Sequence, residues 1–157
     1  MIAAHLPAGY LQYRAMGRRG KAALSAALAG SMAPDLDMIW FHLVDHGTIH
    51  HHRYWPHIPA VWLGLLALAA LIWRVHPAPW VRWVMVFASA CLVHMVLDTL
   101  AGGIMWLWPL DQHLYVWVTV PATRSHWVLS FLLHWTFLVE LAIFAVAGWL
   151  LLFKRTN

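Results

Sequence analysis

The chain has 157 residues and a net charge of +4, with 62% hydrophobic residues and only 10% charged residues. A soluble globular protein carries roughly 25% charged residues, so this composition excludes a water-soluble domain and predicts an integral membrane protein. The basic residues lie mainly at the ends of apolar segments, which is typical of membrane orientation signals and argues against a nucleic-acid-binding face.

The N-terminal third begins with a short apolar segment over residues 1–13. It is shorter than the about 20 residues that span a bilayer, so we expect it to lie along the interface or to enter the helix bundle. A basic cluster over residues 14–21 follows. From residue 22 to Pro34 the chain is rich in Ala, Ser and Gly, which predicts a helix whose neighbours can approach closely.

The rest of the chain alternates apolar segments with turns. An apolar piece at 38–44 leads into a polar loop at 45–57, and helices are predicted at 58–73 and 80–101. The Trp-rich region 104–127 reads as an irregular or interfacial cap, and a last long helix covers about 127–153. We therefore predict an all-α polytopic membrane protein with about four transmembrane helices plus short re-entrant or interfacial segments, built as one domain over residues 1–157.

The basic residues predict the orientation of these helices. The cluster at 14–21, Arg74 with Arg82, and Lys154-Arg155 can all lie on one side, which the positive-inside rule makes cytoplasmic. With a rise of about 1.5 Å per residue, Asp35, His94 and Glu140 lie about 18–21 Å above this side and His57 about 25 Å. Polar residues from separate helices are thus expected at one level in the outer half of the membrane.

Two pairs of polar residues on the predicted helices have spacings that suit metal binding. His94 and Asp98 are four residues apart, so they share a helix face and can reach the same ion. Asp35 and Asp37 directly follow the helix-breaking Pro34, and carboxylates within a membrane need a partner. The alternative for this second pair is a hydrated cap at the interface.

A histidine-rich turn supplies the third group of candidate ligands. His52 and His57 flank Arg53 and three aromatic or proline residues, which favours a shaped turn over a random polar loop. A solvated loop is the alternative, and it fits His50 and His51 better than His52 and His57. Imidazole and carboxylate together suit zinc as the first choice, with manganese or iron as alternatives, in a site of one or two divalent ions.

Two further residues are candidates for catalysis. Arg53 can hold a phosphate through its planar guanidinium group, with interfacial snorkelling as the alternative. Glu140, in the last predicted helix, can be a further ligand, a general base or a partner of a ligand imidazole, with a structural ion pair as the alternative.

These segments together resemble the YdjM-like family of bacterial inner-membrane, metal-dependent hydrolases. The resemblance covers residues 5 to about 110 and rests on four motifs in the family's order: His5-Leu-Pro-Ala-Gly9, Ala33-Pro-Asp-Leu-Asp37, His52-Arg-x-x-x-His57 and His94-x-x-x-Asp98. It implies a helical protein of the bacterial inner membrane with a hydrolase-like metal centre. The metal positions that it implies are His5, Asp35, Asp37, His52, His57, His94 and Asp98.

One motif departs from the family pattern. Where the family usually reads His-Arg-Gly-x-Thr-His, this chain has Tyr54, Trp55 and Pro56 between Arg53 and His57. The turn is therefore bulkier here, at a position beside the predicted metal ligands.

The leading hypothesis is a membrane-embedded metal-dependent hydrolase that uses a metal-activated water on a lipid or lipid-linked small molecule, with a phosphoester as the first choice of bond. A metal-dependent amide or ester hydrolase acting on a lipid is the chemical alternative. A different class of function, a metal-binding transporter, sensor or structural membrane partner without catalysis, uses the same ligands. We expect the lipid bilayer and the substrate, and no nucleic acid, as partners.

Overall fold

The computed structural model describes residues 3–17 and 20–153 of the chain. Within these ranges the regular structure is helical, apart from one isolated antiparallel bridge between Ile104 and Tyr115. The all-α prediction is thus confirmed. The helices are α1 His5–Ala15, α2 Gly20–Met32, η1 Pro34–Leu36, α3 Asp37–Leu43, η2 His51–Arg53, η3 Trp55–His57, α4 Pro59–Val75, α5 Pro79–Thr99, α6 Trp127–Leu132 and α7 Phe137–Phe153.

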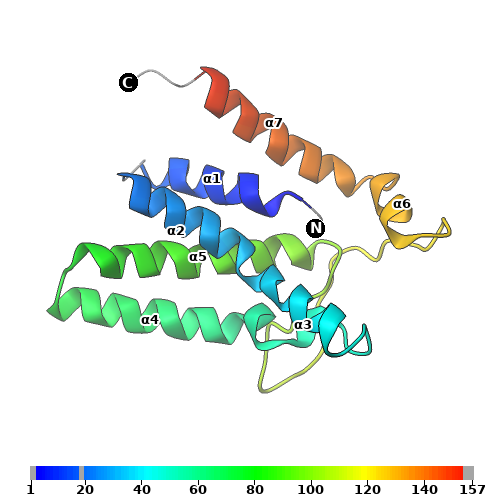
Figure 1. Ribbon diagram of the computed structural model, residues 1–157, viewed down its shortest axis with the longest axis horizontal. Helices are drawn as coiled ribbons and strands as arrows, with labels where there is room; N and C mark the ends of the chain where they lie inside the picture. Colours follow the sequence, from blue (N-terminus) through cyan, green and yellow to red (C-terminus); the bar gives the residue numbers. More distant parts are fainter. Residues whose placement is uncertain (1–2, 18–19, 154–157) are drawn as a thin grey trace.

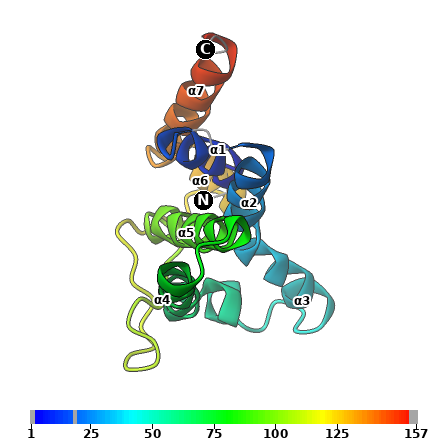
Figure 2. The same cartoon turned by 90° about the vertical axis from the view of Figure 1, so that its left-hand side faces the viewer.

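Helix α5 is the centre of the bundle. It packs against α1, α2 and α4, and α1 in turn separates it from α7. Figure 1 shows α4 and α5 side by side, with α1 and α2 against the other side of α5, and Figure 2 shows the same order from the end of the bundle. The N-terminal segment therefore enters the bundle, which is one of the two arrangements that the sequence left open.

Small residues allow the close packing of α2 with its neighbours. A Cβ added to Gly30 would lie 2.3 Å from the backbone oxygen of Phe87 in α5, and one added to Gly9 would lie 2.5 Å from Oγ of Ser31. Real Cβ atoms cannot come this close to other heavy atoms, so both contacts require glycine. The close approach predicted for the Ala, Ser and Gly helix is confirmed.

The prediction of one long helix over residues 127–153 is wrong, because the chain forms two helices there. Helix α6 ends at Leu132 and α7 begins at Phe137, so residues 133–136 interrupt the predicted span of 127–153. In the interruption, Nδ1 of His134 lies 3.0 Å from Oγ1 of Thr136 and 3.4 Å from its backbone nitrogen. Side-chain bonds of this kind compete with the helical backbone ladder, and hydropathy alone does not reveal them.

The surface of the bundle is apolar over several of its helices. Many large apolar residues are exposed, among them Leu71 in α4, Val96 in α5 and Leu152 in α7. Among the described helices, α5 with 21 residues is long and apolar enough to cross a membrane, whereas α4 and α7 are shorter apolar helices of 17 residues each. The prediction of four spans goes further than this and stays a prediction. Arg18, Arg19, Lys154 and Arg155, which contributed to the predicted orientation, lie outside the described residues.

Candidate metal centre

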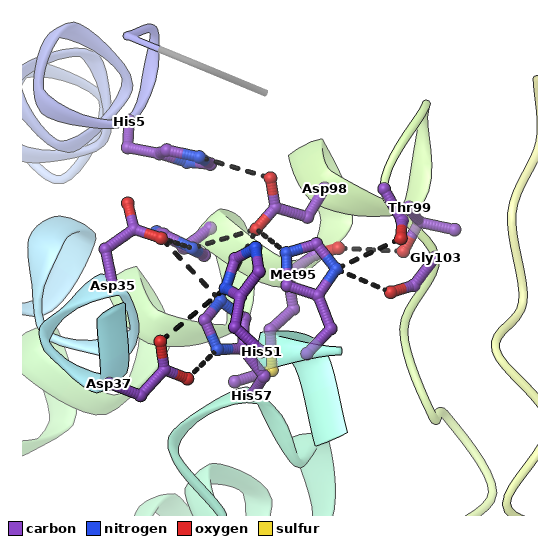
Figure 3. A network of polar contacts seen from close by, with 12 residues as sticks. His5, Asp35, Asp37, His51, His57, Met95, Asp98, Thr99 and Gly103 are labelled. Carbon is purple, nitrogen blue, oxygen red and sulfur yellow. Dashed lines mark hydrogen bonds and ion pairs between the residues drawn. The ribbon is translucent and has the colours of Figure 1, made fainter. Parts of the chain in front are cut away.

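The candidate ligands come together at one end of α5, although they are far apart in the sequence (Figure 3). His94 and Asp98 lie on α5, and their facing atoms, Nε2 and Oδ2, are 2.9 Å apart. The other segments bring their residues to this pair from α1, from the kink after α2, and from the turn before α4. The residues from these segments are His5, Asp35, Asp37, His52 and His57. Asp35, His57 and His94, which were expected at one level, therefore do come together. Glu140, expected at the same level, is in neither group of candidate ligands among the described residues, and the position of this level in the membrane stays a prediction.

One oxygen of Asp98 lies at the middle of the group. Its Oδ2 atom is 3.6 Å from Nε2 of His52, 3.7 Å from Nε2 of His57 and 2.9 Å from Nε2 of His94. Oδ1 of Asp35 approaches from the opposite side, 3.5 Å from Nε2 of His94 and 3.8 Å from Nε2 of His57. Asp35, His57, His94 and Asp98 thus direct one atom each toward a common point, with His52 next to them.

These separations fit ligands around a single ion. Asp35, His57, His94 and Asp98 each offer one ligand atom, and the four atoms all lie within 4.8 Å of one another. Zinc bonds to nitrogen and oxygen are about 2.0–2.2 Å long, so neighbouring ligand atoms in a tetrahedral site are about 3.3–3.6 Å apart. The four separations that link the imidazoles to Asp35 and Asp98 run from 2.9 to 3.8 Å.

The hydrogen bonds behind the histidines determine which ring nitrogen faces the group. Nδ1 of His94 donates to the backbone oxygen of Ser31 at 2.8 Å, and Nδ1 of His57 donates to Oδ2 of Asp37 at 2.6 Å. Nδ1 of His52 donates to the backbone oxygen of Gly103 at 2.8 Å. In a neutral imidazole with its proton on Nδ1, Nε2 is a lone-pair acceptor. Metal-binding histidines typically have such partners on the other nitrogen.

The resulting arrangement places acceptors opposite acceptors in a buried site. The Nε2 atoms of His57 and His94 are buried without a hydrogen-bond partner, and they face carboxylate oxygens. Such an arrangement needs a cation, either a proton on an imidazole or a metal ion, because buried lone pairs repel one another and lose their water. One metal ion satisfies both imidazoles and both carboxylates at once.

Two residues outside the long apolar helices α4, α5 and α7 are held in the forms that bind metal. Burial lowers the pKa of His52 to about 3, so its imidazole is neutral at physiological pH. Burial by itself raises the pKa of Asp37, but the neighbouring imidazoles of His51 and His57 outweigh it and hold the pKa below the ordinary value. Neutral imidazole and ionised carboxylate are the forms that bind metal.

Two of the predicted ligands, Asp37 and His5, contact residues of this group without belonging to it. Asp37 lies behind His57 and accepts the proton of its Nδ1. The ring of His5 stacks on the ring of His94 with centroids 3.6 Å apart, and its Nε2 lies 3.2 Å from the second oxygen of Asp98. Neither residue belongs to the four that converge on one point. Position in a motif did not distinguish the four converging residues from these two neighbours, whose roles as ligands stay predictions.

The two predicted catalytic residues have different surroundings. Arg53 is exposed in η2, directly after the buried His52. Glu140 is fully buried in α7, where its Oε2 accepts a hydrogen bond from the backbone nitrogen of Ala3 at 3.1 Å. Glu140 is therefore connected to the start of α1, two residues before His5, and belongs to neither group of candidate ligands among the described residues.

Sequence reasoning missed two features of the site. The backbone oxygens of Ser31 and Gly103 fix the orientation of His94 and His52. Every residue has a backbone carbonyl group, so a sequence pattern cannot show which of them will bind a histidine. A solvated loop was the expected setting of His51. Its side chain is only 25% exposed, and its Nδ1 lies 3.6 Å from Oδ1 of Asp37. Its position beside His52 was the available signal.

Comparison with known proteins identifies a family but no close relative of established structure. The family model described as YdjM inner membrane protein matches residues 1–156. No curated protein and no solved structure matches the chain.

Proposed function

The chain belongs to the YdjM inner membrane protein family, and from this premise we propose that it is a metal-dependent hydrolase that acts on a lipid or lipid-linked phosphoester. The observation that supports the proposal is the convergence of Asp35, His57, His94 and Asp98 on one point inside the bundle. The Nδ1 atoms of His52, His57 and His94 already have hydrogen-bond partners, and carboxylates lie opposite their Nε2 atoms. This arrangement is more typical of ligands to a divalent ion than of polar contacts that only hold helices together. Zinc is the first choice, and manganese or iron are alternatives.

A bound divalent ion supplies a water of lowered pKa and an electrophile for the phosphoryl oxygen. The protein contributes the positions of the groups around it. His57 and His94 are fixed from behind by Asp37 and by the backbone oxygen of Ser31. Their rings therefore cannot turn away without breaking these bonds, and the site is formed before substrate arrives.

Asp35 is the member of the group with access to the outside. Its side chain is 29% exposed, whereas those of His57, His94 and Asp98 are at most 2% exposed. The substrate therefore enters on the side of Asp35, and a partly exposed carboxylate at the entrance is suited to accept a proton from the attacking water. Arg53 is exposed in the same turn as His52, where its guanidinium group can bind a phosphate headgroup.

The membrane setting favours a lipid as the class of substrate. Apolar side chains cover the outside of α4, α5 and α7, so a site within this bundle is reached most directly from the bilayer. We propose a multi-pass arrangement of about four spans in which the metal centre lies toward the periplasmic half of the inner membrane. The 17 residues of α4 and α7 correspond to about 26 Å, so they cross a core of about 30 Å only with local thinning or with flanking residues.

The test is a comparison of metal content and hydrolysis in detergent-purified protein. Wild type is expected to contain near-stoichiometric zinc, manganese or iron and to release phosphate from phospholipids or lipid-linked phosphates. Asp98→Asn is expected to abolish turnover. Val96→Ala, at an exposed position of the same helix, is the control and is expected to retain turnover.

The same experiment separates the alternatives. Release of fatty acid or amine instead of phosphate would assign the amide or ester reaction. Bound metal without turnover on any of these substrates would favour a transporter or sensor. No bound metal after reconstitution with each ion, together with a large loss of thermal stability in Asp98→Asn, would reject the hydrolase and leave a structural role for the cluster.

A further inference from the structure

A second group of candidate ligands adjoins the first. His51, His52 and His57 each offer one nitrogen, and these three atoms lie within 4.8 Å of one another. The rings of His51 and His52 have centroids 4.1 Å apart, and those of His51 and His57 are 5.2 Å apart and perpendicular. His57 belongs to both groups, so the two positions are neighbours and not separate sites.

Asp37 directs one oxygen at this second group. Its Oδ2 bonds to Nδ1 of His57, which leaves Oδ1 for another partner. That Oδ1 lies 3.6 Å from Nδ1 of His51, and both atoms are buried without a hydrogen-bond partner. The side chain of Asp37 is only 3% exposed, so water cannot readily satisfy the free oxygen. Figure 3 shows Asp37 beside His51 and His57, with a dashed line to each ring.

We propose that Asp37 Oδ1 and His51 Nδ1, with His52 beside them, form a second divalent-cation position next to the first. This inference rests on the proposed metal centre and extends it to two ions. His51 is 25% exposed, which gives the second ion access from outside the bundle. In this arrangement Asp37 joins the two positions, because one oxygen holds the second ion and the other orients His57 toward the first.

The charges of the site support two ions over one. Asp35, Asp37 and Asp98 contribute three negative charges when ionised, and the histidines contribute none when neutral. One divalent cation leaves a net charge of −1, which is costly in an apolar environment. A second cation changes the sum to +1, and an anionic substrate oxygen then neutralises it.

A pair of ions points to a phosphoester as the substrate class. Two ions about 3.5–4 Å apart stabilise both the attacking and the leaving oxygen of an in-line displacement at phosphorus. In this reaction, the bond from the water oxygen to phosphorus forms as the bond to the leaving oxygen breaks. The proton that the water loses passes to a carboxylate and from there to the leaving oxygen, so that one phosphoester and one water give one phosphate and one alcohol.

The experiment counts ions in the full-length, detergent-purified chain after saturation with zinc and desalting. Wild type is expected to retain two zinc ions per chain, and His51→Ala one. His51→Phe, which preserves the aromatic contacts with Phe41 and His50 but removes the ligand nitrogen, is expected to retain one as well. His42→Ala removes an exposed imidazole of α3 and is expected to retain two. With manganese, wild type is expected to give a spin-coupled resonance that both His51 variants lose.

The outcomes distinguish this inference from the metal centre on which it rests. One zinc ion in wild type, unchanged in His51→Phe, would overturn the second position and leave the first intact. No zinc in wild type would overturn both. Loss of all zinc from a folded His51→Phe, with a melting temperature near that of wild type, would assign His51 to the first ion and also overturn the second position.

Discussion

Gly102 lies against the ring of His52 and leaves no room for a side chain. A Cβ added there would be 2.5 Å from Cε1 of His52, 3.2 Å from its Nδ1 and 3.1 Å from the backbone oxygen of Asp98. Carbon atoms in contact are about 3.5–4.0 Å apart. Gly102→Ala is therefore expected to displace the imidazole by about 1 Å, although neither the old nor the new residue binds metal.

The closest of these contacts is with the ring of His52, so the displacement acts on metal binding mainly through this residue. It disturbs the bonds from Nδ1 of His52 to the backbone oxygens of Gly102 and Gly103, which are 3.1 and 2.8 Å long. Loss of such orienting partners typically lowers metal affinity 10- to 100-fold. We expect the dissociation constant for zinc, measured by competition with a chromogenic chelator, to rise by about this factor in Gly102→Ala.

The matched control is a glycine with free space around it. Nothing lies within 4 Å of a Cβ added to Gly64 in α4, so Gly64→Ala is expected to keep wild-type zinc affinity. It should also stabilise the helix by about 0.5–1 kcal/mol. A Gly102→Ala protein that binds zinc as tightly as wild type would refute the role given to His52. Equal loss of affinity in Gly64→Ala would show that the assay reports on helix packing.

Three further predictions test the packing, the metal and the topology. Gly30→Ala places a Cβ against the backbone oxygen of Phe87, so we expect a loss of about 1–3 kcal/mol of stability and a lower melting temperature. Gly148→Ala, where nothing lies within 4 Å of the added Cβ, is the control and is expected to cause no loss. Removal of metal by EDTA should lower the melting temperature, because zinc at 100 times its dissociation constant stabilises a protein by about 2.7 kcal/mol; an unchanged value would contradict a metal centre. A reporter fused after Asn157 should be cytoplasmic if the basic ends face inward, and a periplasmic signal would invert the proposed position of the site.

The sequence was sufficient to predict those features that depend on composition and on the spacing of nearby residues. Length and composition predicted a helical membrane protein, and helices predicted at 58–73 and 80–101 correspond to α4 and α5. The spacing of His94 and Asp98 placed both on one helix face, because an α-helix returns to the same side after four residues. The choice of candidate ligands also came from sequence, since carboxylate and imidazole are rare in apolar segments unless they have a partner.

Only the tertiary structure decided which of these residues face the candidate ion position and which orient another residue. Whether a histidine binds an ion or supports another residue depends on which ring nitrogen faces the site, and contacts across the fold determine this, such as Ser31 with His94. For the same reason, one oxygen of Asp37 orients His57 while the other faces His51, and Glu140 accepts a hydrogen bond from Ala3. The sequence determined which residues are candidates to bind a metal. The packing of α1, α2 and the turn before α4 against α5 determined the distances between them and which ring nitrogen of each histidine faces the site.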